Sequence, residues 1–168
     1  MELRPVSDAD VPFLAEMTLL AAFPPGPLPE GASEMAQATR WTADWGRPGD
    51  AGVVAWGDGQ RLGSAWCRVQ ADVVARDGAG HPLPEIAIAV SLTHRARGIG
   101  AQILNALDRA ASDAGHRALS LTVNAANPAL HLYERAGFEV VRREGDRLTM
   151  VKPLGAPSPE PRLVSFAG

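Results

Sequence analysis

Cysteine, tyrosine and long hydrophobic runs are all scarce in this chain of 168 residues. Its one cysteine, Cys67, excludes an internal disulfide and a zinc site built from several thiolates, so we expect a reducing, cytoplasmic location. No apolar run approaches the roughly 20 residues that a membrane-spanning helix needs. The first ten residues carry acids where a secretory signal would carry a basic stretch, so we expect no export signal.

Charge of either sign shows no large excess. The chain has 16 Lys and Arg against 19 Asp and Glu, a net charge of −3, which gives no electrostatic reason to expect a nucleic-acid partner. With 46% hydrophobic and 21% charged residues, the composition is that of a globular protein rather than a disordered or fibrous one. We assign residues 1–154 to one domain and 155–168, which carry three prolines, to a loose C-terminal tail.

Glycine and proline, at 17 and 14 residues, divide the chain into short elements. Strands are predicted at residues 2–6, 52–56, 61–71, 86–90, 118–123, 138–142 and 147–152. Helices are predicted after a Ser7–Asp8 cap, over 33–45, from the loop 93–100 to Gly115, and from Asn127 to Gly137, whereas the proline-rich stretch 23–31 is predicted to be a loop. This order predicts an α/β fold with a central mixed, mostly antiparallel sheet of about seven strands and helices on both faces.

The most informative segment is 86–104, IAIAVSLTHRARGIGAQIL, which reads as a buried strand, a loop with arginine and glycine, and an amphipathic helix. Gly98 and Gly100 allow close approach of a ligand to backbone N–H groups at the helix N-terminus, where anions are favoured. Arg95 and Arg97 add positive charge, so the loop suits a pyrophosphate. A tight turn with a solvated arginine rim is the other interpretation of these four residues. A Walker loop is excluded because its Gly-Lys-Ser/Thr ending is absent.

A second segment, 122–141, decides between these interpretations. It reads TVNAANPALHLYERAGFEVV and joins a strand end, an Asn-Pro helix start, a tyrosine and an Ala-Gly-Phe exit. Together with the arginine–glycine loop it resembles the GNAT superfamily of acyl-CoA-dependent N-acyltransferases, over residues 85–141. The sequence departs from the common family wording at Leu92, where proline is frequent, and at Ala96, where glycine is usual.

The resemblance implies a GNAT-like fold that transfers an acetyl group from acetyl-CoA directly to a primary amine of a small molecule or a protein, in a ternary complex and without a metal. The backbone of the buried strand would pair with the pantetheine arm, and the N–H of Val90 would polarise the thioester carbonyl. The residues implied for the arm are Ala89, Val90 and Leu92. Those implied for the pyrophosphate are Arg95, Ala96, Arg97, Gly98, Ile99, Gly100 and Ala101.

Two asparagines and the only tyrosine complete the implied site. Asn127 corresponds to the cofactor-contacting asparagine of the family and fits equally well as a helix cap, whereas Asn124 is the weaker candidate for the same surface. Tyr133 falls on the tyrosine of the family pattern, here NPALHLYERAGF, and would protonate the leaving thiolate. A phenol with a pKa near 10 is protonated at neutral pH, while a departing thiolate with a pKa near 8.5 needs a proton.

The base that accepts the proton of the amine does not fall on the commonest family position. Glu85 opens the buried strand and is the candidate base, but the commonest base position of the family falls one residue away, on Pro84. Because side chains alternate along a strand, one residue decides which face the carboxylate takes, unless a bulge restores it. His81 is an alternative proton relay, and a solvated strand-start residue is the other interpretation of Glu85.

Other functions remain open at this point. A catalytically silent acyl-CoA-binding sensor or scaffold would keep the loop but need neither Tyr133 nor a base. Nucleotide binding through the two loop arginines is disfavoured by the charge balance. The four histidines lack metal-ligand spacing, and Trp41 and Trp45 are expected in the core, with an aromatic wall for the acceptor as the alternative. The acceptor itself cannot be identified, and a homodimer is suggested only because family members often pair.

Overall fold

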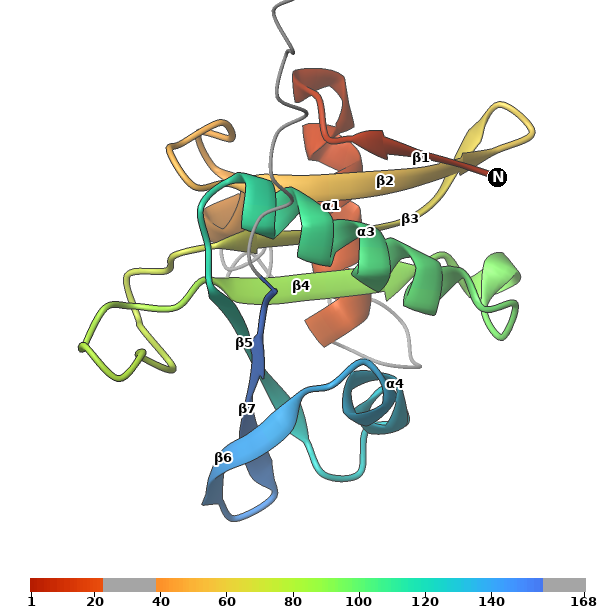
Figure 1. The fold of residues 1–168 in the computed structure, drawn as a ribbon. Helices are drawn as coiled ribbons and strands as arrows, with labels where there is room; N and C mark the ends of the chain where they lie inside the picture. The colour runs from red at the N-terminus through yellow and green to blue at the C-terminus, as the bar shows by residue number, and fades with distance from the viewer. Residues whose placement is uncertain (23–38, 156–168) are drawn as a thin grey trace, which may run out of the picture.

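The structure is a computed structural model that describes residues 1–22 and 39–155. Within them the chain forms a seven-stranded sheet with the order β1-β2-β3-β4-β5-β7-β6 (Figure 1). The strands are β1 (Glu2–Pro5), β2 (Ala51–Gly57), β3 (Gln60–Arg68), β4 (Glu85–Val90), β5 (Ala118–Asn124), β6 (Glu139–Glu144) and β7 (Arg147–Pro153). Only β4 and β5 pair in parallel among them. The predicted mixed, mostly antiparallel sheet is therefore confirmed.

The helices are α1 (Val11–Ala22), α3 (Ile99–Asp113) and α4 (Leu130–Arg135), with two 3₁₀ turns, η1 (Asp8–Asp10) and η2 (Leu92–His94). Ser7 is the N-cap of η1, the turn that leads into α1, and its backbone N–H donates to the Asp10 carboxylate at 2.8 Å. Of the helix predicted over 33–45, residues 39–42 are helical, whereas 33–38 and the predicted loop 23–31 lie outside the described residues. Asp44, with a φ of 51°, turns the chain out of this helix.

Helices cover both faces of the sheet, as predicted (Figure 1). Along β4, Ile86 and Ile88 belong to the core under α3, while Ala87 and Ala89 belong to the core under α1. This alternation places Glu85 on the α1 face. The α3 core also contains Cys67, and Trp41 and Trp45 pack against the α1 core, as expected for core residues. No helix in the two described ranges is long and apolar enough to cross a membrane.

The parallel pairing between β4 and β5 consists of a single register pair, Glu85 with Ser120. At this point Ser120 donates two hydrogen bonds to the Pro84 carbonyl, one from its backbone N–H and one from its hydroxyl, each at 2.9 Å. Beyond it the two strands separate, and Figure 1 shows β5 turning away from β4. The sheet therefore opens in a V whose apex lies at Glu85.

A buried ion pair fixes the segment that leads into β2. The guanidinium of Arg68 on β3 contacts Asp50 twice, with N–O distances of 2.9 and 2.6 Å, and donates to the Ala43 carbonyl at 2.7 Å. Both side chains are almost completely buried, at 2% and 3% exposure. The pair attaches residues 40–50 to the α1 face of the sheet, next to the apex of the V, because Arg68 lies opposite Glu85 in the β3–β4 register.

Replacing one partner of this pair is expected to be costly. Asp50→Ala leaves the buried Arg68 charge uncompensated, so we expect the free energy of unfolding in urea to fall by about 3–5 kcal/mol. Arg47→Ala is the matched control, because its pair with Asp44 at 3.2 Å is exposed and contributes about 1 kcal/mol or less. Equal losses in the two variants would show that burial of the Arg68 pair does not stabilise the fold.

Candidate active site

A cavity of about 580 Å³ lies where β4 and β5 have separated. It is enclosed by the end of α1, the second half of β4, the loop before α3 and the start of α4. Its wall includes ten of the residues implied for the site: Ala89, Val90, Arg95, Ala96, Gly98, Ile99, Gly100, Ala101, Asn127 and Tyr133. The described structure thus brings most of the predicted site together, and Leu92, Arg97, Asn124 and Glu85 lie outside this wall.

The backbone of β4 presents unpaired groups to the opening. Ser91 donates its N–H to the Leu62 carbonyl of the β3 side at 2.8 Å. Because directions alternate in an antiparallel pair, Ala89 also points its backbone toward β3, whereas Ile88 and Val90 point theirs toward β5. Since β5 has already turned away there, an extended ligand can bind these groups as an added strand does. Sequence reasoning named Ala89 and missed Ile88, because the direction depends on the register.

Leu92 takes a different place from the strand residues. It lies in the 3₁₀ turn η2, and the residue is 60% exposed. The guanidinium of Arg95 folds back over the end of β4 and donates through Nε to the Val90 carbonyl at 3.2 Å. Of the polar backbone groups of Val90, the carbonyl is therefore occupied, and the N–H faces the opening.

The loop before α3 turns backbone N–H groups toward the cavity. Gly98, with a φ of 74°, is the N-cap of α3, so the N–H groups of Ile99, Gly100 and Ala101 have no partner within the helix. Ala96 has a φ of 59°, a conformation that glycine adopts at less cost, which explains why glycine is usual there in the family. The N–H groups of Ile99, Gly100 and Ala101, here called the cradle, lie at the positive end of the helix dipole and therefore suit an anion.

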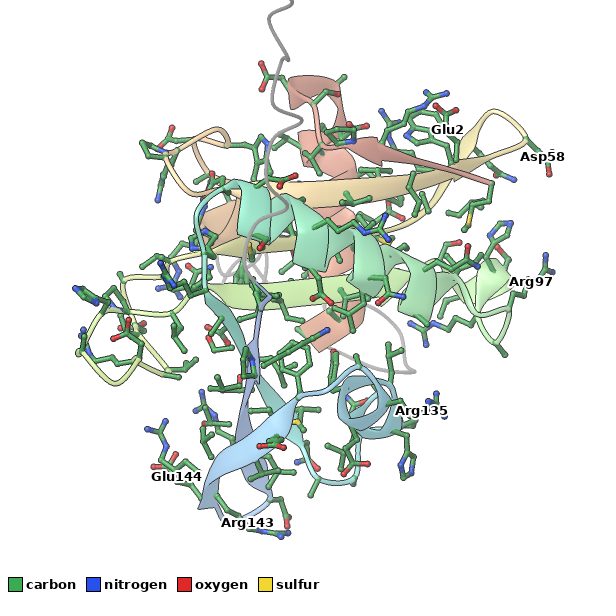
Figure 2. The ribbon with its side chains drawn as sticks, in the orientation of Figure 1. Glu2, Asp58, Arg97, Arg135, Arg143 and Glu144 are labelled. Carbon is green, nitrogen blue, oxygen red and sulfur yellow. The ribbon has the colours of Figure 1, made fainter. Side chains whose placement is uncertain are left out.

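Two arginine side chains lie at the mouth of the cavity. Arg95 and Arg135 line it together with His94. Figure 2 shows Arg97, on the loop before α3, and Arg135, on α4, at the same end of the molecule, where the V opens. Arg135 was missed by sequence reasoning, although its spacing of three from Leu132 places both on one face of α4.

Asn127 lines this cavity and a second one beside it, whereas Asn124 lines only the second. Asn127 lines the first cavity, which agrees with its expected place beside a ligand, and its side-chain oxygen accepts the N–H of Ala129 at 2.9 Å. Because α4 begins at Leu130 with Ala129 as N-cap, this bond holds the turn before the helix, and the expected cap role of Asn127 is wrong. Asn124 accepts the N–H of Ala126 at 2.8 Å and lines a second cavity of about 420 Å³. This cavity adjoins the first, and both are lined by Ala21, Asn127 and Pro128.

Tyr133 presents its hydroxyl in the first cavity. Its ring packs edge-on against Phe138, with centroids 5.9 Å apart. Burial raises the pKa of Tyr133 to about 12, so the phenol stays protonated throughout the ordinary pH range. In the described residues its hydroxyl has no hydrogen-bond partner. The group is thus a proton donor available to a ligand.

Glu85 lies at the apex of the V and points to the α1 face. The β3–β4 register contains no bulge, so Glu85 keeps the face that simple alternation gives it, opposite to that of Pro84, and at 8% exposure it is buried rather than solvated. Thr122 Oγ1 donates to the carboxylate at 3.3 Å, and Thr122 lines the second cavity. Burial raises the pKa of Glu85, and the Thr122 hydrogen bond and the charge of Arg147 oppose this rise. His81, by contrast, is exposed and contacts Asp77 at 3.1 Å.

Comparison with known proteins agrees with this geometry. The profile of the acetyltransferase (GNAT) family matches residues 15–138. The chain belongs to this family. No curated protein matches the sequence significantly. In the described residues, no three His, Cys, Asp or Glu side chains are placed to hold a metal ion together.

Solved structures of the family share the whole fold. A phosphinothricin acetyltransferase from Sinorhizobium meliloti, solved with acetyl-CoA, is 25% identical with a TM-score of 0.64, and 94% of this chain and 90% of that one are covered. A ribosomal-protein-alanine N-acetyltransferase from Brucella melitensis is 23% identical with a TM-score of 0.67, and 92% and 100% are covered. Family membership and the acetyl-CoA complex support acetyl transfer in general.

Two glycine substitutions are expected to have opposite effects. A Cβ on Gly100 would lie 3.4 Å from Leu132 and 3.9 Å from Val90, both in the cavity wall, so Gly100→Ala should fold but bind CoA at least ten-fold more weakly. A Cβ on Gly98 would meet nothing within 4 Å, but the positive φ of Gly98 disfavours alanine. Gly98→Ala should therefore lower the free energy of unfolding by about 1 kcal/mol and weaken CoA binding less than Gly100→Ala does. Calorimetric titration with CoA and urea unfolding check both. Unchanged CoA affinity in Gly100→Ala would contradict the role of the cradle.

Proposed function

We propose that the protein transfers the acetyl group of acetyl-CoA to a primary amine of a small molecule or a protein, in a ternary complex of both substrates. The observation that carries the proposal is the pair of adjoining cavities at the V, one lined by Tyr133 and the other by Thr122, which is bonded to Glu85. The cofactor and the acceptor can therefore approach each other from two sides of one opening.

The residues of the first cavity suit acetyl-CoA. Its backbone groups at Ile88 and Val90 match the amides of an extended pantetheine arm, and the cradle before α3 matches a diphosphate. Arg95 must release the Val90 carbonyl when this arm binds, and its guanidinium then becomes available to the diphosphate. Acetyl-CoA supplies the acyl group in the activated form of a thioester. Contacts of Leu92 and Arg97 with the cofactor belong to the same proposal, with support only from their place at the mouth.

Three groups of the chain act on the reacting atoms in this proposal. Glu85 takes up the proton of the amine through intervening water, because about 16 Å of β4 separates it from Val90. The amine nitrogen then bonds to the carbonyl carbon. The N–H of Val90 donates to the carbonyl oxygen as negative charge develops there. Tyr133 donates its proton to the sulfur as the carbon–sulfur bond breaks. The products are an N-acetylated amine and the free thiol of CoA.

The buried cysteine supports transfer without an acyl-enzyme. Cys67 is fully buried in the α3 core, and burial raises the pKa of its thiol to about 12, so it is not a usable nucleophile. Direct transfer needs both substrates bound at once, which the two adjoining cavities permit. A cytoplasmic location and pairing as a homodimer are part of the same proposal, supported by the single cysteine and by the family resemblance.

Glu85→Gln tests the base. We expect kcat/KM to fall at least 10²-fold, as assayed by release of free thiol with a panel of amines. The wild-type rate should rise with pH through the raised pKa of Glu85, and this acid limb should vanish in the variant. Glutamine carries no charge to desolvate, so the melting temperature at neutral pH should not fall. A wild-type rate in Glu85→Gln would remove the assigned base.

Tyr133→Phe tests the acid. The substitution keeps the ring packed against Phe138 and removes only the hydroxyl, so CoA affinity and stability should change little while kcat falls about 10²-fold. An undiminished kcat would contradict the role of Tyr133. If the wild type binds acetyl-CoA but acetylates none of the amines, the sensor or scaffold function is favoured instead.

A further inference from the structure

The face of the sheet around Glu85 carries charges that the proposed chemistry does not use. On β7, Leu148 and Met150 belong to the α3 core, so Arg147 and Thr149 project from the opposite face, which Glu85 shares. Arg147 lies opposite Asn124 in the β5–β7 register. Asn124 lines the second cavity, whereas Arg147 is not among its lining residues, so the register places Arg147 beside this cavity and exposed at its outside.

Within the described residues the guanidinium of Arg147 makes no hydrogen bond and no ion pair, although its charge acts on Glu85. Two neighbouring charges form an ion pair with each other: Glu144 contacts Arg142 at 3.7 Å. Glu144 is also the register partner of Arg147 across the β6–β7 hairpin, without an ion pair between them. Arg142 in turn donates to the Val74 carbonyl and to the Thr149 hydroxyl, each at 3.4 Å. Arg68, opposite Glu85, is bound by Asp50. Arg147 is therefore the cation of this group that remains available to a ligand.

Spacing on the sheet suits a small acceptor. Thr122 and Asn124 are two residues apart on β5, and Arg147 is diagonal to Thr122 at roughly 7–8 Å, a gap that a long side chain can bridge. An amine beside Glu85 and Thr122 can therefore place an acidic group on the guanidinium of Arg147. The part of the cavity wall that the structure describes contains small side chains such as Ala21 and Ala22, and none of its described residues offers a carboxylate to a second positive charge.

We propose that Arg147 is an anion subsite of the acceptor cavity and that the acceptor is an amine bearing a carboxylate, as a free amino acid is. This inference rests on the proposed function and names its substrate class. The guanidinium binds the carboxylate through paired N–H···O bonds, which orients the amine toward Glu85. Acceptors with additional positive charges are disfavoured, because Arg147 repels them.

The test compares free L-amino acids with the matching amino-acid amides, which keep the amine and lose the negative charge. The wild type should acetylate the acids with the higher kcat/KM. Arg147→Gln should raise KM for the acids at least ten-fold, change kcat little, and leave KM for the amides unchanged. Binding of the acids to the CoA-saturated protein, followed by thermal shift, should be lost in the same variant.

Arg143→Gln is the matched control. Arg143 lies on the same hairpin, opposite the core residue Leu148, and therefore on the other face of the sheet. Figure 2 shows it at the end of the β6–β7 hairpin. This variant should keep the wild-type preference for acids. It shows whether any loss in Arg147→Gln comes from the subsite rather than from the hairpin or the net charge.

Two outcomes would overturn the subsite. Equal wild-type values for acids and amides would exclude it. A uniform loss in Arg147→Gln with all acceptors, together with an upward shift of the acid limb, would show that Arg147 acts only on the charge of Glu85. If the wild type turns over no amine, the proposed transfer fails, and the thermal shift still decides the subsite, which is refuted if acids and amides bind equally.

Discussion

The site depends on the point at which β4 and β5 stop pairing. Ser120 uses both its backbone N–H and its hydroxyl on the Pro84 carbonyl, and one register pair later the strands have separated. A continued ladder would have bonded Ile88 and Val90 to β5 and closed the cavity between β4 and α4. The sheet thus gives up backbone hydrogen bonds in its centre, where buried polar groups are costly to leave unpaired. A ligand with amides along its length can satisfy these groups.

The two faces of the sheet differ in chemistry at this opening. On the α3 face, large apolar side chains form the main core and the cavity leads to the N-terminus of a helix. On the α1 face, a row of polar side chains crosses β4, β5 and β7 at Glu85, Thr122 and Thr149. Burial raises the pKa of Glu85, which costs stability when the group is ionised and makes its carboxylate a stronger base. The buried Arg68–Asp50 pair attaches residues 40–50 to the same face of the sheet, and this stabilises the structure around the ionised Glu85.

Much of the fold and of the cofactor cavity was predictable from local sequence patterns. The hydrophobic runs and turn residues predicted all seven strands, and the loop from Arg95 to Ala101 lies where an anion cradle was expected. The direction of backbone groups along β4 was not predictable, because Ala89 and Ile88 differ only in register. The second cavity joins α1 to β5 across a long sequence distance, so neither its existence nor the place of Asn124 in it follows from a motif. Arg147 carries no motif at all, and its relation to Glu85 arises only from the order of β5 and β7 in the sheet.

The central claim is that Ile88 and Val90 present backbone groups that β5 does not bond, and that the pantetheine arm of acetyl-CoA pairs with them. Amide hydrogen exchange at single residues, measured by NMR with and without saturating CoA, tests it most directly. The N–H groups of Ile88 and Val90 should exchange at least 100-fold more slowly when CoA is bound, while those of Ala87 and Ala89, which face β3, should be slow in both states. Exchange at Ile88 and Val90 that CoA leaves unchanged would contradict the account.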